Sequence, residues 1–189
     1  GEETDIQEEI SEDITAEKTV WTVRDTIISE YKGEGMVAAV IDSSFDTGHY
    51  TFALSDDETA RLTLDDIDSL FGELNASEDL ESAEDIYVSA KIPFAFDYGE
   101  GDTDLEAVNL EHGTHVAGII AGNNTEGNES GFWGIAPEAQ IVMMKIMDSD
   151  GYLQNYCIYE ALDDAMTLGV DSVNLSLGYV SGFAEDADP

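Results

Sequence analysis

The chain has 189 residues, 42% of them hydrophobic, which suits one domain with a sizeable core and not a disordered acidic polypeptide. Six basic against 43 acidic residues give a formal net charge of −37, so the surface repels nucleic acids and no nucleic-acid partner is expected. No stretch reaches the roughly 18 apolar residues of a membrane span. Cys157 is the single cysteine, which excludes an internal disulfide and, in an apolar helical pattern, predicts a buried structural thiol.

The first part of the chain is strongly acidic. We interpret residues 1–18 as an acidic leader or the remnant of a pro-segment. Apolar residues in 19–31 predict a helix that packs on the core. The turn residues Lys32-Gly33-Glu34-Gly35 follow.

An uninterrupted apolar run at 36–41 predicts a strand that is buried on both faces, as the strands of parallel sheets are. Asp42 follows at its C-terminal end, where the ligands of open α/β sheets bind. By itself Asp42 is as readily a turn-capping residue as a functional one. A histidine partner would favour the functional interpretation.

Residues 51–106 form a long acidic excursion. Leu64, Ile67, Leu70 and Phe71 recur at helical spacing, and a short strand is predicted at 92–96. We interpret the segment as an acidic insertion or surface extension, since it has too few apolar residues for a core of its own. Binding of calcium or of a basic partner by this insertion is an open hypothesis.

From His112 onward the pattern becomes regular. A helix is predicted at 112–121, a strand at 141–147, a helix at 154–168 and a strand at 172–177. The first helix carries small residues that permit close approach to a neighbour: Gly113, Ala117, Gly118 and Ala121. The apolar face of the second is expected to consist of Ile158, Ala161, Leu162, Ala165 and Met166. Strand, helix and strand in this order predict an α/β fold, a parallel sheet with helices on both faces.

Asp42 and His112 are predicted to lie at the same edge of the sheet. An imidazole that a carboxylate orients can act as a general base, so the pair forms two thirds of a Ser-His-Asp system. His49 and His115 are interpreted as structural. Zinc is not expected, because zinc-binding helices usually space their histidines by four with an intervening glutamate. A G-x-S-x-G elbow is absent, which argues against an α/β-hydrolase.

Tyr31-Lys32-Gly33-Glu34-Gly35, Phe45-Asp46 and Phe96-Asp97-Tyr98 are similar to segments of the lactocepin-like cell-envelope proteinases of Gram-positive bacteria, the group of subtilisin-like serine proteases that the chain resembles most. Four further segments resemble the subtilisin-like proteases in general. They are Val40-Ile41-Asp42-Ser43, His112-Gly113-Thr114-His115-Val116-Ala117-Gly118, Gly134-Ile135-Ala136-Pro137 and Val173-Asn174-Leu175-Ser176-Leu177-Gly178. The resemblance implies that residues 19–189 are the N-terminal part of a subtilase catalytic domain, and hence an incomplete subtilisin-like fold.

The resemblance also implies roles for particular residues. Asp42 would be the acid of the triad and His112 its general base. Gly151, Tyr152 and Leu153 would form a backbone edge that pairs with a peptide substrate. Ser176, Leu177 and Gly178 would form the facing edge and a wall of the specificity pocket.

The chain departs from the family pattern in three places. Ser44 stands where the family usually has glycine, so the turn there is expected to differ. The loop 122–131 does not match the calcium-binding loop of small subtilisins, and no metal or other cofactor is expected. The oxyanion asparagine and the Gly-Thr-Ser nucleophile segment lie beyond these residues in the family. Ser176 is not expected to replace that serine, because it falls inside the predicted strand 172–177.

These observations predict a secreted or cell-wall anchored serine endopeptidase whose substrates are proteins or peptides. The 189 residues alone are expected to be inactive. Their expected partners are the remainder of the catalytic domain and, through an open sheet edge, a second copy of the chain. The alternative is a subtilase-like binding or regulatory module without catalysis.

Overall fold

The computed structural model describes residues 31–106, 111–123 and 132–178. Within them, four parallel strands form one sheet in the order β2-β3-β1-β4. The strands are β1 (Val37–Asp42), β2 (Phe94–Asp97), β3 (Gln140–Lys145) and β4 (Ser172–Leu175). The helix predicted at 19–31 lies almost wholly outside the described residues, as does the leader 1–18.

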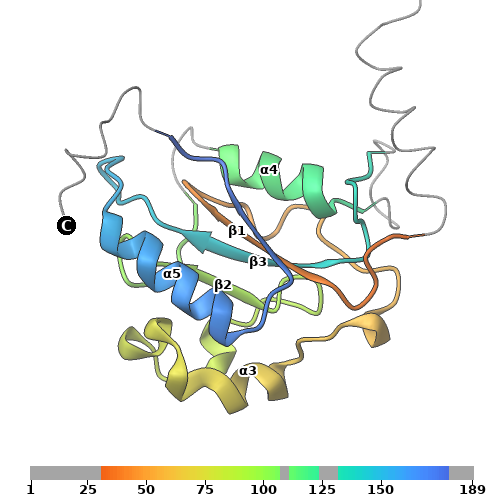
Figure 1. Cartoon of the computed structure of the whole chain (residues 1–189), viewed down its shortest axis with the longest axis horizontal. Helices are drawn as coiled ribbons and strands as arrows, with labels where there is room; N and C mark the ends of the chain where they lie inside the picture. Colours follow the sequence, from red (N-terminus) through yellow and green to blue (C-terminus); the bar gives the residue numbers. More distant parts are fainter. Residues whose placement is uncertain (1–30, 107–110, 124–131, 179–189) are drawn as a thin grey trace, which may run out of the picture.

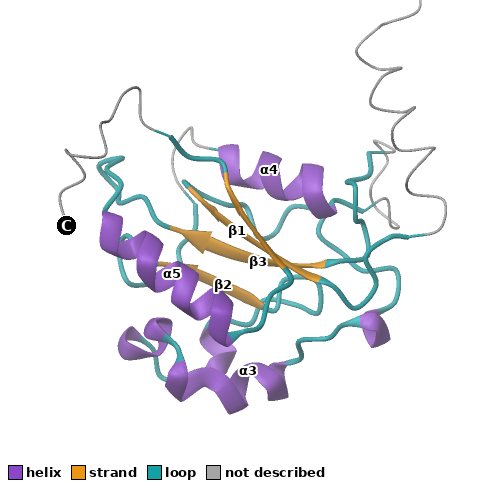
Figure 2. Cartoon of the chain, in the orientation of Figure 1, coloured by secondary structure: helices purple, strands orange, loops and turns teal. Residues whose placement is uncertain are grey.

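Helices cover both faces of the sheet, as predicted (Figures 1 and 2). Helix α4 (His112–Ala121) lies on one face, and α3 (Leu64–Leu70) and α5 (Asn155–Thr167) lie on the other. Four 3₁₀ helices link α3 to its surroundings: Asp57–Thr59, Phe71–Glu73, Asn75–Asp79 and Ala83–Asp85. The sequence prediction of an α/β fold with a parallel sheet is confirmed.

Strand β1 is buried along its whole length, because it lies between β3 and β4 and is covered on both faces. Its side chains alternate between two apolar clusters. Ala38 and Val40 pack with residues of α4, whereas Val37, Ala39 and Ile41 pack with residues of α5 and of the segment 62–86. A strand in this position requires the unbroken apolar run seen in the sequence.

The acidic segment 51–106 contributes to this core. Phe94–Asp97 is strand β2 of the central sheet, paired with β3. Apolar side chains between residues 62 and 86 join the cluster under β1: Leu62, Ile67, Leu74, Ala76, Ala83 and Ile86. The segment is therefore built into the domain and does not only extend its surface. The division of the whole chain into a leader and a domain stays a prediction.

Helix α5 differs from its predicted apolar face at one position. Met166 is 77% exposed, so its assignment to the buried face is wrong. The buried residues are Cys157, Ala161, Asp164 and Ala165, and Cys157 is the buried thiol that the sequence predicted. Asp164 can be buried because its carboxylate accepts hydrogen bonds from Asn75 N (2.7 Å), Ala76 N (3.1 Å) and Tyr98 Oη (2.7 Å).

Strand β4 forms an exposed edge of the sheet. Within the described residues it pairs only with β1, and it ends at Leu175, two residues earlier than predicted. Val173 and Leu175 are 39% and 42% exposed. This agrees with the expectation of an open edge and an uncovered apolar face. No helix in the described part of the chain is long and apolar enough to cross a membrane.

Candidate active site

Asp42 is the last residue of β1, and its side chain is completely buried. Its Oδ1 accepts hydrogen bonds from the backbone nitrogen of Ser43 (2.7 Å) and from the Ser43 hydroxyl (3.1 Å). Alternation along β1 directs Asp42 to the face covered by α4. A carboxylate thus lies beneath the first turn of that helix.

His112 is the first residue of α4, and its Nδ1 lies 2.8 Å from Oδ1 of Asp42. The acceptor is a carboxylate, so Nδ1 carries the hydrogen and Nε2 is left to accept a proton. The side chain of His112 is 54% exposed, whereas that of Asp42 is inaccessible. This is the geometry of a general base that is oriented from behind and open to a substrate in front.

Gly113 makes this contact possible. A Cβ at this position would lie 2.3 Å from the carbonyl oxygen of Ser44 and 3.0 Å from Cβ of Asp42. Only glycine lets the helix approach the end of β1 so closely. The prediction that small residues of this helix permit close approach is confirmed at Gly113. Gly118 is buried too, but a Cβ there would meet only Phe132 Cε1 at 4.0 Å.

The two predicted substrate-binding segments leave the same edge of the sheet. Because β1 lies between β3 and β4, the segment after β3 and the segment after β4 start on either side of Asp42. The carboxyl edge of the sheet, where ligands of open α/β sheets bind, is thus the edge at which His112 lies.

The segment after β3 forms a tight turn. Met147 and Leu153 form an antiparallel bridge, and Asp148 N donates to Tyr152 O over 3.0 Å. Gly151 has a φ of 82°, which glycine adopts without strain. Tyr152 is 68% exposed, so this turn lies at the surface.

The segment after β4 is partly anchored. Leu177 packs against the core, whereas Ser176 and Gly178 are exposed. The hydroxyl of Ser176 accepts a hydrogen bond from Asn174 Nδ2 (2.9 Å). Strand β4 ends at Leu175, so Ser176 lies just past it, and the prediction that Ser176 falls inside the strand is wrong.

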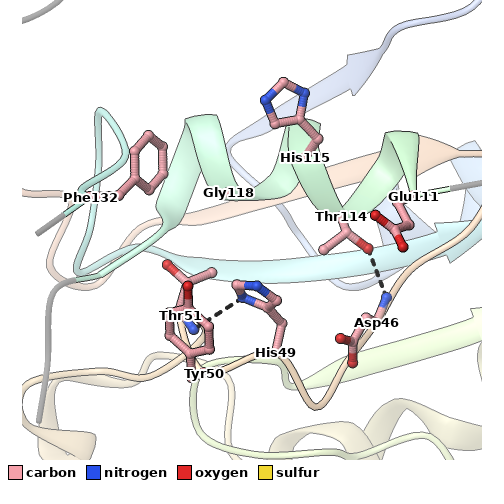
Figure 3. Close-up of a pocket in the computed structure, with 9 residues that line it drawn as sticks. All are labelled: Asp46, His49, Tyr50, Thr51, Glu111, Thr114, His115, Gly118 and Phe132. Carbon is pink, nitrogen blue, oxygen red and sulfur yellow. Dashed lines mark hydrogen bonds between the residues drawn. The ribbon is translucent and has the colours of Figure 1, made fainter. Parts of the chain in front are cut away.

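The other two histidines line a cavity of about 570 Å³ beside α4 (Figure 3). His49 accepts a hydrogen bond from Thr51 N over 3.3 Å and stacks on Tyr50 at 4.3 Å between ring centroids. His115 projects from α4, where it lines this cavity and is exposed. Neither histidine contacts Asp42 in the described structure, so His112 alone pairs with it.

A second cavity, of about 420 Å³, lies next to Gly151. Most of its lining residues are acidic, and Lys145 is the one basic residue among them. The acidic residues are Asp97, Glu100, Asp102, Asp104, Glu106, Asp148 and Asp150. Burial raises the pKa of Asp97, although the hydrogen bond from the buried Lys145 ammonium works in the opposite direction. Among the described residues, no group of three or more His, Cys, Asp or Glu side chains is arranged to hold a metal ion.

Residues 33–188 match the model of the subtilase family, peptidase family S8. The chain belongs to the subtilase family. A PII-type proteinase of Lactococcus lactis subsp. cremoris is 34% identical over 166 residues, which cover 85% of this chain and 8% of that protein. A C5a peptidase of Streptococcus pyogenes serotype M3 is 35% identical over 160 residues, which cover 78% of this chain and 12% of that protein.

The similarity to the cell-envelope proteinases was predicted from the sequence and is confirmed. The chain spans about a tenth of the length of these curated relatives. Among solved structures, the CspB protease of Clostridium perfringens superposes with a TM-score of 0.49 at 19% identity, covering 79% of this subtilase chain and 30% of that protein.

Two serines of the site were not given roles in the sequence interpretation. Ser43 donates two hydrogen bonds to Asp42, and Ser44 lies against Gly113. A hydroxyl directly after a strand-ending aspartate was the available signal for Ser43. The contact between Ser44 and Gly113 joins segments 69 residues apart and had no local signal.

Proposed function

We propose that this subtilase chain supplies the Asp42–His112 half of the catalytic site of a serine endopeptidase. His112 takes the proton of a serine nucleophile as that serine attacks the scissile carbonyl, and it then gives the proton to the leaving amine. Asp42 holds the imidazole in the required tautomer and stabilises its charged form. The observation that carries the proposal is the 2.8 Å contact between His112 Nδ1 and buried Asp42.

The substrate is a protein or peptide that binds in an extended conformation. Gly151, Tyr152 and Leu153 pair with one side of its backbone, and Ser176, Leu177 and Gly178 line the other. Hydrogen bonds to a backbone edge are independent of side-chain identity, so such a site accepts many sequences. The exposed turn at Gly151 and the position of both segments beside Asp42 support this assignment.

We propose that the nucleophilic serine and the oxyanion asparagine lie outside these 189 residues, which contain no Gly-Thr-Ser segment. The remainder of a catalytic domain is therefore the principal partner. The sequence motifs resemble those of the cell-envelope proteinases, so we propose a secreted or cell-wall anchored location.

The test uses two polypeptides. The 189-residue chain alone is expected to show no hydrolysis of a fluorogenic peptide and no labelling by a fluorophosphonate. The same chain, continued along its reading frame through a Gly-Thr-Ser segment, should show both. In the longer protein, His112→Ala is expected to lower turnover on the order of 10⁶-fold and Asp42→Asn on the order of 10⁴-fold, the sizes of loss found for equivalent changes in Ser-His-Asp proteases.

Labelling of a serine within the 189 residues would contradict the proposal. A reading frame that continues without such a segment would instead favour a subtilase-like binding or regulatory module. Sequencing beyond Pro189 thus separates the two functions before any assay.

A further inference from the structure

Two buried oxygen atoms beneath the start of α4 have no hydrogen-bond partner. One is Oδ2 of Asp42, and the other is Oγ of Ser44, a residue that is 1% exposed. The first is an acceptor without a donor, and the second carries a proton without an acceptor. Buried polar groups in folded proteins almost always find partners, because leaving them unpaired is unfavourable.

The hydrogen bonds of Asp42 are distributed unevenly between its two oxygens. Oδ1 lies within hydrogen-bonding distance of Ser43 N (2.7 Å), Ser43 Oγ (3.1 Å) and His112 Nδ1 (2.8 Å). A carboxylate has roughly four lone-pair positions, two on each oxygen. Oδ1 is therefore fully occupied, and any further donor has to bind at Oδ2.

Ser44 is well placed to supply that donor. It follows Asp42 by two residues, a separation of about 7 Å in extended chain, which an aspartate and a serine side chain can bridge. Gly113 marks their proximity, since a Cβ there would lie close to Ser44 O (2.3 Å) and to Cβ of Asp42 (3.0 Å). Both residues thus lie under the same turn of α4.

We propose that Ser44 is a positioning residue whose hydroxyl donates to Oδ2 of Asp42. This inference rests on the proposed function, in which Asp42 orients His112. A donor on Oδ2 fixes the carboxylate against rotation, so that Oδ1 stays aligned with His112 Nδ1. It also draws negative charge toward Oδ2 and moderates the strength of the bond to His112. This hydrogen bond requires Ser44 to adopt another staggered rotamer, since its Oγ has no partner in the present one.

The experiment compares Ser44→Ala with Thr51→Val in the 189-residue chain. Thr51 is a matched control because its Oγ1 is also buried and unpaired but lies away from Asp42. Ser44→Ala is expected to raise the unfolding equilibrium constant about ten-fold. It should also move the Nδ1 proton resonance of His112 downfield, since a carboxylate with one donor fewer accepts more strongly. Thr51→Val is expected to leave the resonance in place and stability unchanged or higher.

The same comparison in an Asp42→Ala background isolates the pair. There the effect of Ser44→Ala on unfolding is expected to shrink to less than about three-fold. Equal effects in both backgrounds would overturn the proposal, as would a Ser44→Ala variant that is as stable as the parent with an unmoved resonance. If Ser44→Ala does not fold, Ser44→Gly gives the same readings. Neither measurement requires peptidase activity. Failure of the Ser44 proposal can therefore be distinguished from failure of the proposed function.

Discussion

Gly113 and Ser44 touch so closely that a single methyl group at Gly113 would meet the carbonyl oxygen of Ser44 at 2.3 Å. This contact joins the first turn of α4 to the chain just past β1. It thereby sets the position of His112 relative to Asp42, and the short distance between their side chains depends on it.

Gly113→Ala is expected to push α4 away from β1 and to destabilise the domain by about 1–3 kcal/mol, the usual cost of overpacking. The His112–Asp42 hydrogen bond should weaken, which the Nδ1 proton resonance of His112 reports together with urea unfolding. Gly118→Ala on the same helix is the control, because its Cβ would meet only Phe132 Cε1 at 4.0 Å. A helix favours alanine over glycine by about 1 kcal/mol, so this variant should be neutral or more stable. Similar destabilisation by both would contradict the interpretation.

The ion pair between Asp97 and Lys145 joins the ends of β2 and β3, and both side chains are buried. Lys145→Met is expected to lower the free energy of unfolding by about 3–5 kcal/mol, because it leaves a buried carboxylate without its counter-charge. Chemical denaturation measures this loss. Arg61→Met, which removes a partly exposed pair with Asp171, should cost about 1 kcal/mol or less. A cost for Lys145→Met no larger than that control would show that the pair is not effectively buried.

Lys91 makes stability depend on pH. Its Nζ donates to the carbonyl oxygens of Pro137 (2.7 Å) and Ala139 (2.6 Å), and burial lowers the pKa of Lys91 to about 7, which the nearby Glu138 partly offsets. Below pH 7 the amine is charged in both states. Between pH 7 and about 9 the unfolded chain, with the ordinary lysine pKa of 10.5, binds a proton that the folded chain lacks. The contribution of Lys91 to stability therefore rises with pH in that window, by at most about 1.4 kcal/mol per unit.

Urea unfolding at several pH values between 6 and about 9 measures this slope. Lys91→Met should remove it, whereas Lys32→Met, at a site that is only partly buried, should keep it. Above about pH 9 the comparison is less direct, because burial also raises the pKa of Cys157 and of Tyr98, and these groups then titrate first in the unfolded chain. If the free energy of unfolding of Lys91→Met still rises with pH between 7 and about 9, another group causes the pH dependence.

The exposed strand β4 should let the chain associate with itself in a salt-dependent way. Strand edges pair with other edges, but a net charge of −37 opposes contact between copies until salt screens it. Sedimentation velocity is expected to show mostly monomer at low ionic strength and an increasing dimer fraction in molar NaCl. Val173→Lys, on β4, should abolish the dimer. Dimerisation that is strongest at low salt, or unaffected by this change, would exclude the edge as the interface.

Much of the site could be predicted because its signals are local. The apolar run before Asp42 and the small residues after His112 each report burial on one element, and both elements formed as predicted. The helical spacing around Ile67 also gave α3 correctly. The prediction failed at Met166, because periodicity alone cannot show that the buried face of α5 includes Asp164, whose carboxylate is hydrogen-bonded by Asn75, Ala76 and Tyr98.

The sequence by itself determined the parallel α/β architecture, the family and the Asp42–His112 pair, because hydrophobic periodicity and contiguous motifs are properties of neighbouring residues. Only the tertiary structure decided what surrounds that pair. The approach of Gly113 to Ser44, the burial of Lys91 and the partnership of Asp97 with Lys145 each join segments that are distant along the chain. Such contacts depend on the strand order β2-β3-β1-β4, which no local pattern encodes.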